Sequence, residues 1–227
     1  MGPPFHYVLG PAGATVLAAV RATTVRDLGY RVEDMLALVH SPRLAHIIGV
    51  NDVHASLVAA ARGRGATLAA WWSERQCAVH WGAVVRPDAA GCWCEGGVAG
   101  DFFLEYDRGT ETTGRLAAKV ANYAELAARS GYVSPVLVWL TGGERREREV
   151  RRALAGVRSP AVPVLTGRSG AGVGPADAVW LPVESERRMT LRAALLAFSK
   201  RPEQASRSGQ GTGPTEDDGW GDRGTPD

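Results

Sequence analysis

Lysine is nearly absent from this chain of 227 residues, because only Lys119 and Lys200 stand among its 26 basic residues. The other 24 (26 minus 2) are arginines, and a chain this rich in Ala, Gly and Arg indicates a GC-rich coding sequence in which arginine replaces lysine wherever either will serve. A lysine that remains is informative, since arginine cannot give up a proton and its wide fork cannot replace a point charge. Lys119 is therefore a candidate functional residue.

Cysteine is also scarce, and the three present, Cys77, Cys92 and Cys94, are an odd set for a disulfide framework. That pattern excludes a small disulfide-stabilised secreted protein and agrees with a reducing compartment. Two alternatives stay open for these thiols. Cys77-x-x-His80 with Cys92-x-Cys94 offers four zinc ligands at a non-standard spacing, whereas plain buried thiols are common in protein cores.

No long apolar run and no basic-then-apolar leader is evident, so we expect a soluble, cytoplasmic protein with no membrane contact. A mass of 24.1 kDa suffices for one α/β domain with additional segments. The formal charge is +2, but residues 201–227 hold three arginines against six acids, or −3, which leaves the body at +5. A mildly basic body permits nucleic-acid binding without demanding it.

A β-hairpin is predicted around segment 95–100, whose glycines can adopt positive φ. The flanking strands are 89–94 and 101–106, paired so that opposite residue numbers sum to 195. In this register one face needs a covering layer, since it gathers large apolar side chains. These are Trp93, Phe102, Leu104 and Tyr106.

The other face of the hairpin collects acids. In the expected register Asp88 faces Asp107 and lies diagonal to Glu105, at about 5 and 7 to 8 Å respectively. Carboxylates this close repel each other, and a divalent metal is the usual reason for such a grouping. Glu74, at the end of the preceding strand, is a weaker candidate for the same site. The alternative is that these acids are simply solvated strand ends.

The elements around the hairpin predict an α/β domain with a mixed sheet over residues 41–200. Residues 1–40 look like the remnant of a winged-helix module, with a strand from His6 and a helix over 14–22, followed by a connecting helix at 34–39. Residues 201–227, rich in Gly, Pro, Ser and acids, are predicted to be disordered. Within 41–200 we expect strands at 67–72, 133–140, 162–165 and 178–183, and helices at 43–61, 115–129, 144–157 and 191–198.

Lys119 falls on the predicted helix 115–129, beside its apolar stripe and not opposite it. From that edge the side chain can extend toward the sheet and the acids, or it can snorkel into water. The stripe consists of Leu116, Val120, Tyr123 and Ala127.

The chain resembles the PD-(D/E)XK nuclease superfamily. The resemblance is carried by the order of helices and strands, with Pro87-Asp88 at one strand and Glu105-x-Asp107 at the next. The resemblance implies a restriction-endonuclease-like central mixed sheet with flanking helices. Asp107 departs from the pattern, since a lysine usually stands there. Members of the superfamily can supply that lysine from the following helix, where Lys119 stands.

The chain more narrowly resembles the actinobacterial replication-relaxation family of plasmids and mobile elements. The resemblance covers about Phe5 to Leu165 and is carried by Val50-Asn51-Asp52-Val53, Pro87-Asp88, Phe103-Leu104-Glu105-Tyr106-Asp107-Arg108-Gly109-Thr110-Glu111 and Lys119-x-x-x-Tyr123. It implies DNA as a partner, together with other plasmid replication or transfer proteins.

The resemblance implies hydrolysis of DNA phosphodiesters, with Mg²⁺ or Mn²⁺ held by Asp88 and Glu105 and a water oriented by Lys119. Asp107 would be a further ligand or would hold Lys119, and Glu74 would be an outer ligand. Phosphates would be contacted by Arg75, Arg108 and Arg115. The alternative is a DNA-binding or relaxosome-accessory protein that keeps the fold without the activity.

Overall fold

The computed structural model describes residues 7–39, 41, 43–157, 162–170 and 172–199, so the predicted tail lies outside the described residues. The chain divides into two compact units, Met1–Gly49 and Val50–Asp227. The boundary falls inside helix α3 (Leu44–Arg64), which belongs to both units. The candidate site lies wholly in the second unit.

The first unit contains α1 (Pro11–Val20), α2 (Val32–Val39) and the start of α3. The predicted strand from His6 is wrong where it is described, because residues 7–10 carry no regular secondary structure and His6 lies outside the described residues. Pro11 is well suited to the first turn of a helix, so α1 begins there instead. The winged-helix interpretation relied on that strand and stays a prediction.

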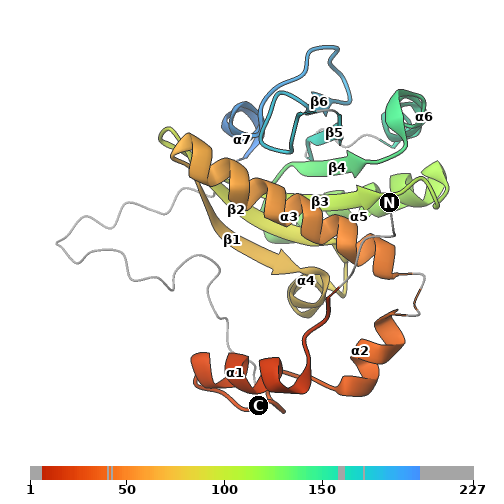
Figure 1. Ribbon diagram of the computed structural model, residues 1–227. Coiled ribbons are helices and arrows are strands. Elements are labelled where there is room, and N and C mark those ends of the chain that lie inside the picture. Colours follow the sequence, from red (N-terminus) through yellow and green to blue (C-terminus); the bar gives the residue numbers. More distant parts are fainter. Residues whose placement is uncertain (1–6, 40, 42, 158–161, 171, 200–227) are drawn as a thin grey trace. The chain divides into compact units, whose positions relative to one another are not determined.

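The second unit is built on a six-stranded mixed sheet in the order β1-β2-β3-β4-β5-β6 (Figure 1). The strands β1, β2 and β3 form an antiparallel meander, β3, β4 and β5 run parallel, and β6 is antiparallel to β5. This arrangement confirms the predicted α/β fold with a mixed sheet. The strand bounds are β1 (Thr67–Ser73), β2 (Ala89–Glu95), β3 (Val98–Asp107), β4 (Val136–Leu140), β5 (Val164–Arg168) and β6 (Leu181–Pro182).

The β2–β3 hairpin forms as predicted, but its register differs by two residues. Ala89 lies opposite Leu104 and Glu95 opposite Val98, so paired numbers sum to 193 and not 195. The turn contains only Gly96 and Gly97, both at positive φ (54° and 77°), which is the requirement of the tightest hairpin turn. A shift of two preserves the faces of a strand. It changes the cross-strand partner of every residue, so that Asp88 lies opposite Glu105 and not Asp107.

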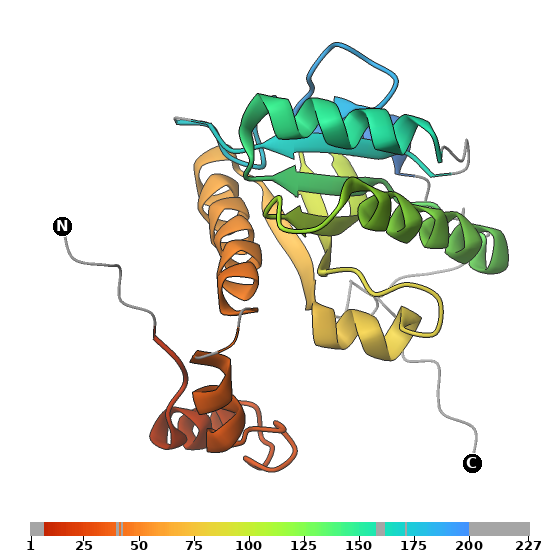
Figure 2. The same ribbon diagram turned by 90° about the vertical axis from the view of Figure 1, so that its right-hand side faces the viewer.

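Helices cover both faces of the sheet (Figure 2). On one face, Trp93, Phe102 and Leu104 pack with α3 and α7 (Leu191–Phe198), so the predicted apolar face of the hairpin has its cover. The opposite face packs against α4 (Glu74–Trp81), α5 (Thr113–Ser130) and α6 (Gly143–Ala155). Glu105 points to this second face, as does Phe103 two residues before it on β3. The candidate site lies on this face.

Helix α4 was not expected, since residues 73–75 were predicted to be the end of the strand at 67–72. The strand ends at Ser73, where Gln76 Oε1 accepts hydrogen bonds from the backbone N–H and the hydroxyl of Ser73 (both 2.9 Å), in the residue pattern of a capping box.

Helix α3 passes, by length and composition, as a segment that could cross a membrane, and it is the only such helix among the described residues. This corrects the expectation that no apolar run is long enough. One side of α3 is nevertheless buried in the core, through Val50, Val53, Leu57 and Ala61. That is the role of a core helix on a sheet.

Candidate functional site

Asp88 occupies the last position before β2 and is fixed against β3. Its backbone N–H donates to the carbonyl of Leu104 (3.1 Å). Its Oδ2 accepts a hydrogen bond from the backbone N–H of Tyr106 (2.8 Å). Two contacts to neighbouring residues of one strand hold the carboxylate in a defined direction, with Oδ1 directed at α5.

Glu105 lies in the middle of β3, between β2 and β4, and is only 2% exposed. A carboxylate at such a position requires partners, because an unpaired buried charge is costly. Both come from α5: Tyr123 donates its hydroxyl to Oε1, and Lys119 forms an ion pair with Oε2.

Lys119 joins the two acids. Its Nζ lies 3.2 Å from Asp88 Oδ1 and also contacts Glu105 Oε2. Lys119 and Tyr123 stand one helical turn apart on α5, so they present their polar ends on one side of the helix. The helix itself is well defined, with Thr112 as its N-cap and Gly131 at φ 69° as its stop. The structure therefore brings Asp88, Glu105 and Lys119 into one small cluster.

Burial dominates the electrostatics of this cluster. It raises the pKa of Glu105 to about 8, even though Lys119 acts in the other direction. Burial alone would lower the pKa of Lys119, but Glu105 and Asp88 outweigh it and the pKa is raised. Burial, with Glu105, also raises the pKa of Tyr123 well above its usual value. Lys119 thus stays an ammonium and Tyr123 stays a hydrogen-bond donor at neutral pH.

Asp107 is held away from this cluster by α6. Arg146 binds its carboxylate with two hydrogen bonds, Nε to Oδ2 (2.7 Å) and Nη2 to Oδ1 (3.1 Å). The backbone N–H of Gly109 also donates to Oδ1 (2.9 Å), and Arg146 reaches the carbonyl of Glu111 (2.8 Å). These contacts fix the loop between β3 and α5. The structure does not place Asp107 as a partner of Lys119, which was one of its two predicted roles.

Glu74 is the first residue of α4, three positions before Cys77, and its role as an outer ligand stays a prediction. Burial raises the pKa of the Cys77 thiol to about 12, and the charges of Glu105, Asp88 and Glu74 add to the shift. Cys77 is therefore an inert thiol. It is also buried in the second core, its Sγ 3.7 Å from the carbonyl of Trp72.

The predicted phosphate-binding arginines lie on separate elements. Arg75 is exposed in the first turn of α4, and Arg115 is exposed in the first turn of α5. Arg108 is half-buried, directly after β3. Their role in binding phosphates stays a prediction.

The zinc alternative is not supported. Among the described residues, no group of three or more His, Cys, Asp and Glu side chains could hold a metal ion. Cys77 and Cys92 are buried, and the ring of His80 lies against Trp72.

Sequence reasoning missed the functions of Tyr123 and Arg146. Tyr123 was expected as part of the apolar stripe and stood in the motif Lys119-x-x-x-Tyr123, but its bond to Glu105 was not predicted. Arg146 had no local signal, because its contact with Asp107 depends on how α6 packs beside β3.

A family model described as replication-relaxation matches residues 2–137, which is more than half of the chain. The matched region contains Asp88, Glu105 and Lys119. No curated protein and no solved structure matches the chain.

Proposed function

Because this chain belongs to the replication-relaxation family, we propose that it is a metal-dependent DNA nuclease of plasmid or mobile-element replication or transfer, acting in the cytoplasm. One observation carries the proposal: the Lys119 ammonium contacts both carboxylates, Asp88 and Glu105, at one point on the sheet. Converging acids and a lysine are the groups that phosphodiester hydrolysis needs.

The element order supports a PD-(D/E)XK core. A helix, three antiparallel strands, a helix and a parallel strand occur in the order α3, β1, β2, β3, α5 and β4, with the short helix α4 inserted between β1 and β2. Asp88 precedes the second strand and Glu105 lies on the third, as the resemblance implies. Asp107 stands where that pattern has lysine, and the lysine of this site comes from α5 instead.

The residues fit a hard divalent cation. Mg²⁺ and Mn²⁺ prefer oxygen ligands, and Mg²⁺ is commonly bound by one or two carboxylates together with waters and substrate phosphates. Asp88 and Glu105 supply two such carboxylates. The space between them already holds a cationic group, the ammonium of Lys119. A bound Mg²⁺ or Mn²⁺ would lower the pKa of its water and so supply the nucleophile.

The protein's own groups then have distinct roles. Tyr123 orients Glu105 by its hydroxyl, and the Tyr106 N–H orients Asp88. Lys119 keeps its proton, so it stabilises negative charge on the reacting phosphate and is not the base. Glu74 is an outer candidate ligand. The phosphates on either side would be bound by Arg75, Arg108 and Arg115.

The test is the conversion of supercoiled plasmid to nicked or linear DNA in Mn²⁺ or Mg²⁺. We expect cleavage by the wild type, and none by Asp88→Ala or Lys119→Ala. Glu149→Gln is the matched control, because it removes a carboxylate from an exposed ion pair with Arg145 on α6. All four proteins should bind DNA.

An accessory DNA-binding protein without cleavage is the second candidate. The Asp107–Arg146 pair favours it, since the position that usually carries the catalytic lysine is committed to fixing a loop. DNA binding with no cleavage by the wild type in any divalent metal would select this candidate and end the nuclease proposal.

A further inference from the structure

Three aromatic rings gather on the surface around α4. Trp72 comes from the end of β1, and His80 and Trp81 come from the last turn of α4. The ring of Trp72 lies 4.2 Å from His80 and 5.4 Å from Trp81 (centroid to centroid), with planes inclined by 32° and 31°. His80 is exposed, and the two tryptophans are half-buried. We call these three residues the aromatic platform.

The platform is linked to the acid cluster by packed rings. Trp81 meets Phe103 edge-on, with centroids 5.0 Å apart and an interplanar angle of 85°. Phe103 in turn lies 5.0 Å from Tyr123, whose hydroxyl binds Glu105. The platform and the acids therefore share one face of the sheet, the face covered by α4, α5 and α6.

Positive charge accompanies the rings. Arg75 is exposed in the first turn of the same helix, and Arg86 is exposed in the segment that leads from α4 to Asp88. The side chain of Val79, next to His80, is 79% exposed, so an apolar contact is available beside the rings. Proteins bind single strands with a combination of aromatic rings and basic side chains, and the segment 72–86 carries both.

We infer that the aromatic platform stacks unpaired bases of a DNA single strand that leads into the Asp88–Glu105–Lys119 cluster. The faces of bases inside a duplex are already stacked, so only unpaired bases can use such rings. A purely structural role explains the inner sides of Trp72 and Trp81, which pack on the second core. It does not explain the exposed His80 ring placed over Trp72. The path into the cluster rests on the proposed nuclease function, whereas the stacking itself does not.

The experiment measures DNA binding without cleavage. Full-length protein carrying Asp88→Asn is titrated, in EDTA, into a fluorescent oligothymidylate and into a duplex of the same length, and anisotropy gives both Kd values. His80→Ala and Trp72→Leu are introduced separately. His54→Ala is the matched control, because His54 stacks on Trp71 (5.0 Å, 37°) across the other face of the sheet.

We expect Trp72→Leu to weaken single-strand binding by roughly 5-fold or more, because it removes the ring on which the exposed His80 ring lies. His80→Ala should weaken it by about 3- to 10-fold, since a smaller ring is lost. Duplex binding should change less than about 2-fold, and His54→Ala should alter neither Kd. His80→Ala removes only an exposed side chain, so it remains informative if Trp72→Leu fails to fold.

Wild-type single-strand affinity in folded His80→Ala protein would overturn the inference, as would an equal loss of duplex binding. The result separates from that of the nuclease proposal. If single-strand binding depends on the rings but the protein never cleaves DNA, the nuclease proposal is wrong and this inference stands. If the protein cleaves plasmid but its single-strand binding does not depend on the rings, this inference is wrong and the nuclease proposal stands.

Discussion

Two buried glutamates, Glu105 on β3 and Glu147 on α6, have opposite electrostatic surroundings. Glu105 and Glu147 are each 2% exposed. Burial raises the pKa of Glu105 to about 8, with one lysine and one tyrosine as partners. Burial would also raise the pKa of Glu147, but hydrogen bonds from Arg188 and Thr166 outweigh it and lower the pKa.

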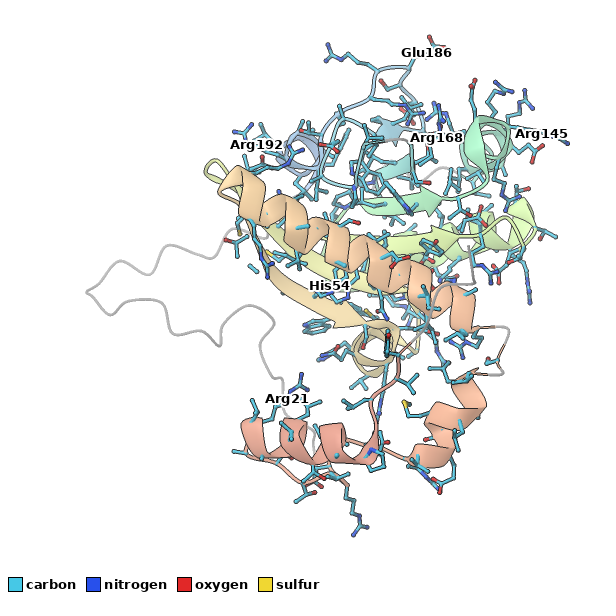
Figure 3. All side chains as sticks on the ribbon, viewed as in Figure 1. Arg21, His54, Arg145, Arg168, Glu186 and Arg192 are labelled. Atoms are coloured by element: carbon cyan, nitrogen blue, oxygen red, sulfur yellow. The ribbon has the colours of Figure 1, made fainter. Side chains whose placement is uncertain are left out.

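The difference lies in how fully each carboxylate is satisfied. Glu147, on α6, accepts bonds from Thr166 (2.9 Å), Arg168 (3.1 Å) and Arg188 (3.1 and 2.5 Å). Arg188 also donates to the carbonyl of Val179 (2.5 Å), so the network ties α6 to β5 and to the chain before α7. Figure 3 shows Arg168 near α6, whereas Arg145 lies on the outer side of that helix. The saturated carboxylate of Glu147 stabilises the fold, whereas Glu105, with Lys119 and Tyr123 as partners, is the residue proposed to hold a metal.

Catalysis should distinguish the two glutamates most strongly. Glu105→Gln removes a charge that the proposed metal site needs, so Mn²⁺-dependent plasmid nicking should fall by about 10³-fold or more, roughly 4 kcal/mol in the barrier. Glu147→Gln, assayed at a temperature where it stays folded, should nick within about 3-fold of wild type. Equal losses in both variants would remove the functional distinction.

The free energy of unfolding should be affected in the opposite order, more by Glu147→Gln than by Glu105→Gln. Glu147→Gln leaves two arginines facing a neutral amide, which should lower the free energy of unfolding by about 2 kcal/mol. This is below the usual range for a broken buried pair, because the Arg168 and Arg188 side chains are 36% and 30% exposed. Glu105→Gln should cost less than about 1 kcal/mol, since its charge is already disfavoured. Urea titration with an unchanged m-value measures both; a larger loss for Glu105→Gln contradicts the comparison.

The pH dependence of stability should have opposite signs at the two sites. The folded-state pKa of Glu105 is raised from 4.5 to about 8, so the folded state holds a proton that the unfolded state releases. Its contribution is present below pH 4.5 and is lost as pH rises toward 8, by at most about 1.4 kcal/mol per pH unit. The pKa of Glu147 is lowered, so its contribution is present above 4.5 and is lost on acidification.

Metal-free unfolding curves for wild type, Glu105→Gln and Glu147→Gln, recorded between pH 4 and 9, give these signs. The difference in the free energy of unfolding between wild type and Glu105→Gln should change between pH 5 and 8. The difference for Glu147→Gln should change only below about pH 4.5. Parallel curves for wild type and Glu105→Gln would show that Glu105 titrates normally.

The smallest expected effect concerns the surface near Glu105. Arg115→Ala should weaken DNA binding uniformly across sequences and reduce the slope of log K against log salt by about 1, as for one lost phosphate contact. Arg145→Ala is the control, because Arg145 is exposed on α6 and paired with Glu149. Binding of both variants at several salt concentrations checks the prediction; identical slopes would exclude Arg115 from the DNA interface.

Local signals in the sequence predicted much of the fold. Alternating apolar residues around Gly96-Gly97 gave the hairpin and its faces, and helical spacing gave α5 with Lys119 at the edge of its stripe. The register was wrong by two, because the turn was assumed to be longer than its two glycines. Helix α4 was missed although Ser73-x-x-Gln76 is a capping-box pattern.

The network of contacts that separates the two glutamates could not be predicted. Glu147 is one of several acids on a highly charged helix, and its sequence neighbours Glu144 and Glu149 form only exposed pairs. Its burial depends on how α6 packs against β5. The pairing of Asp107 with Arg146 has the same origin, since the two residues are 39 positions apart. Such contacts are set by tertiary packing, and no local pattern encodes them.

The most direct test of the Asp88–Glu105–Lys119 site is the rate at which Lys119→Met nicks supercoiled plasmid in Mn²⁺, beside wild type. Methionine keeps the length and apolar stem of the side chain and removes only the ammonium that contacts both carboxylates. We predict nicking by the wild type and none by folded Lys119→Met protein that still binds DNA. Nicking by Lys119→Met at the wild-type rate, or no nicking by the wild type, would contradict the proposed site.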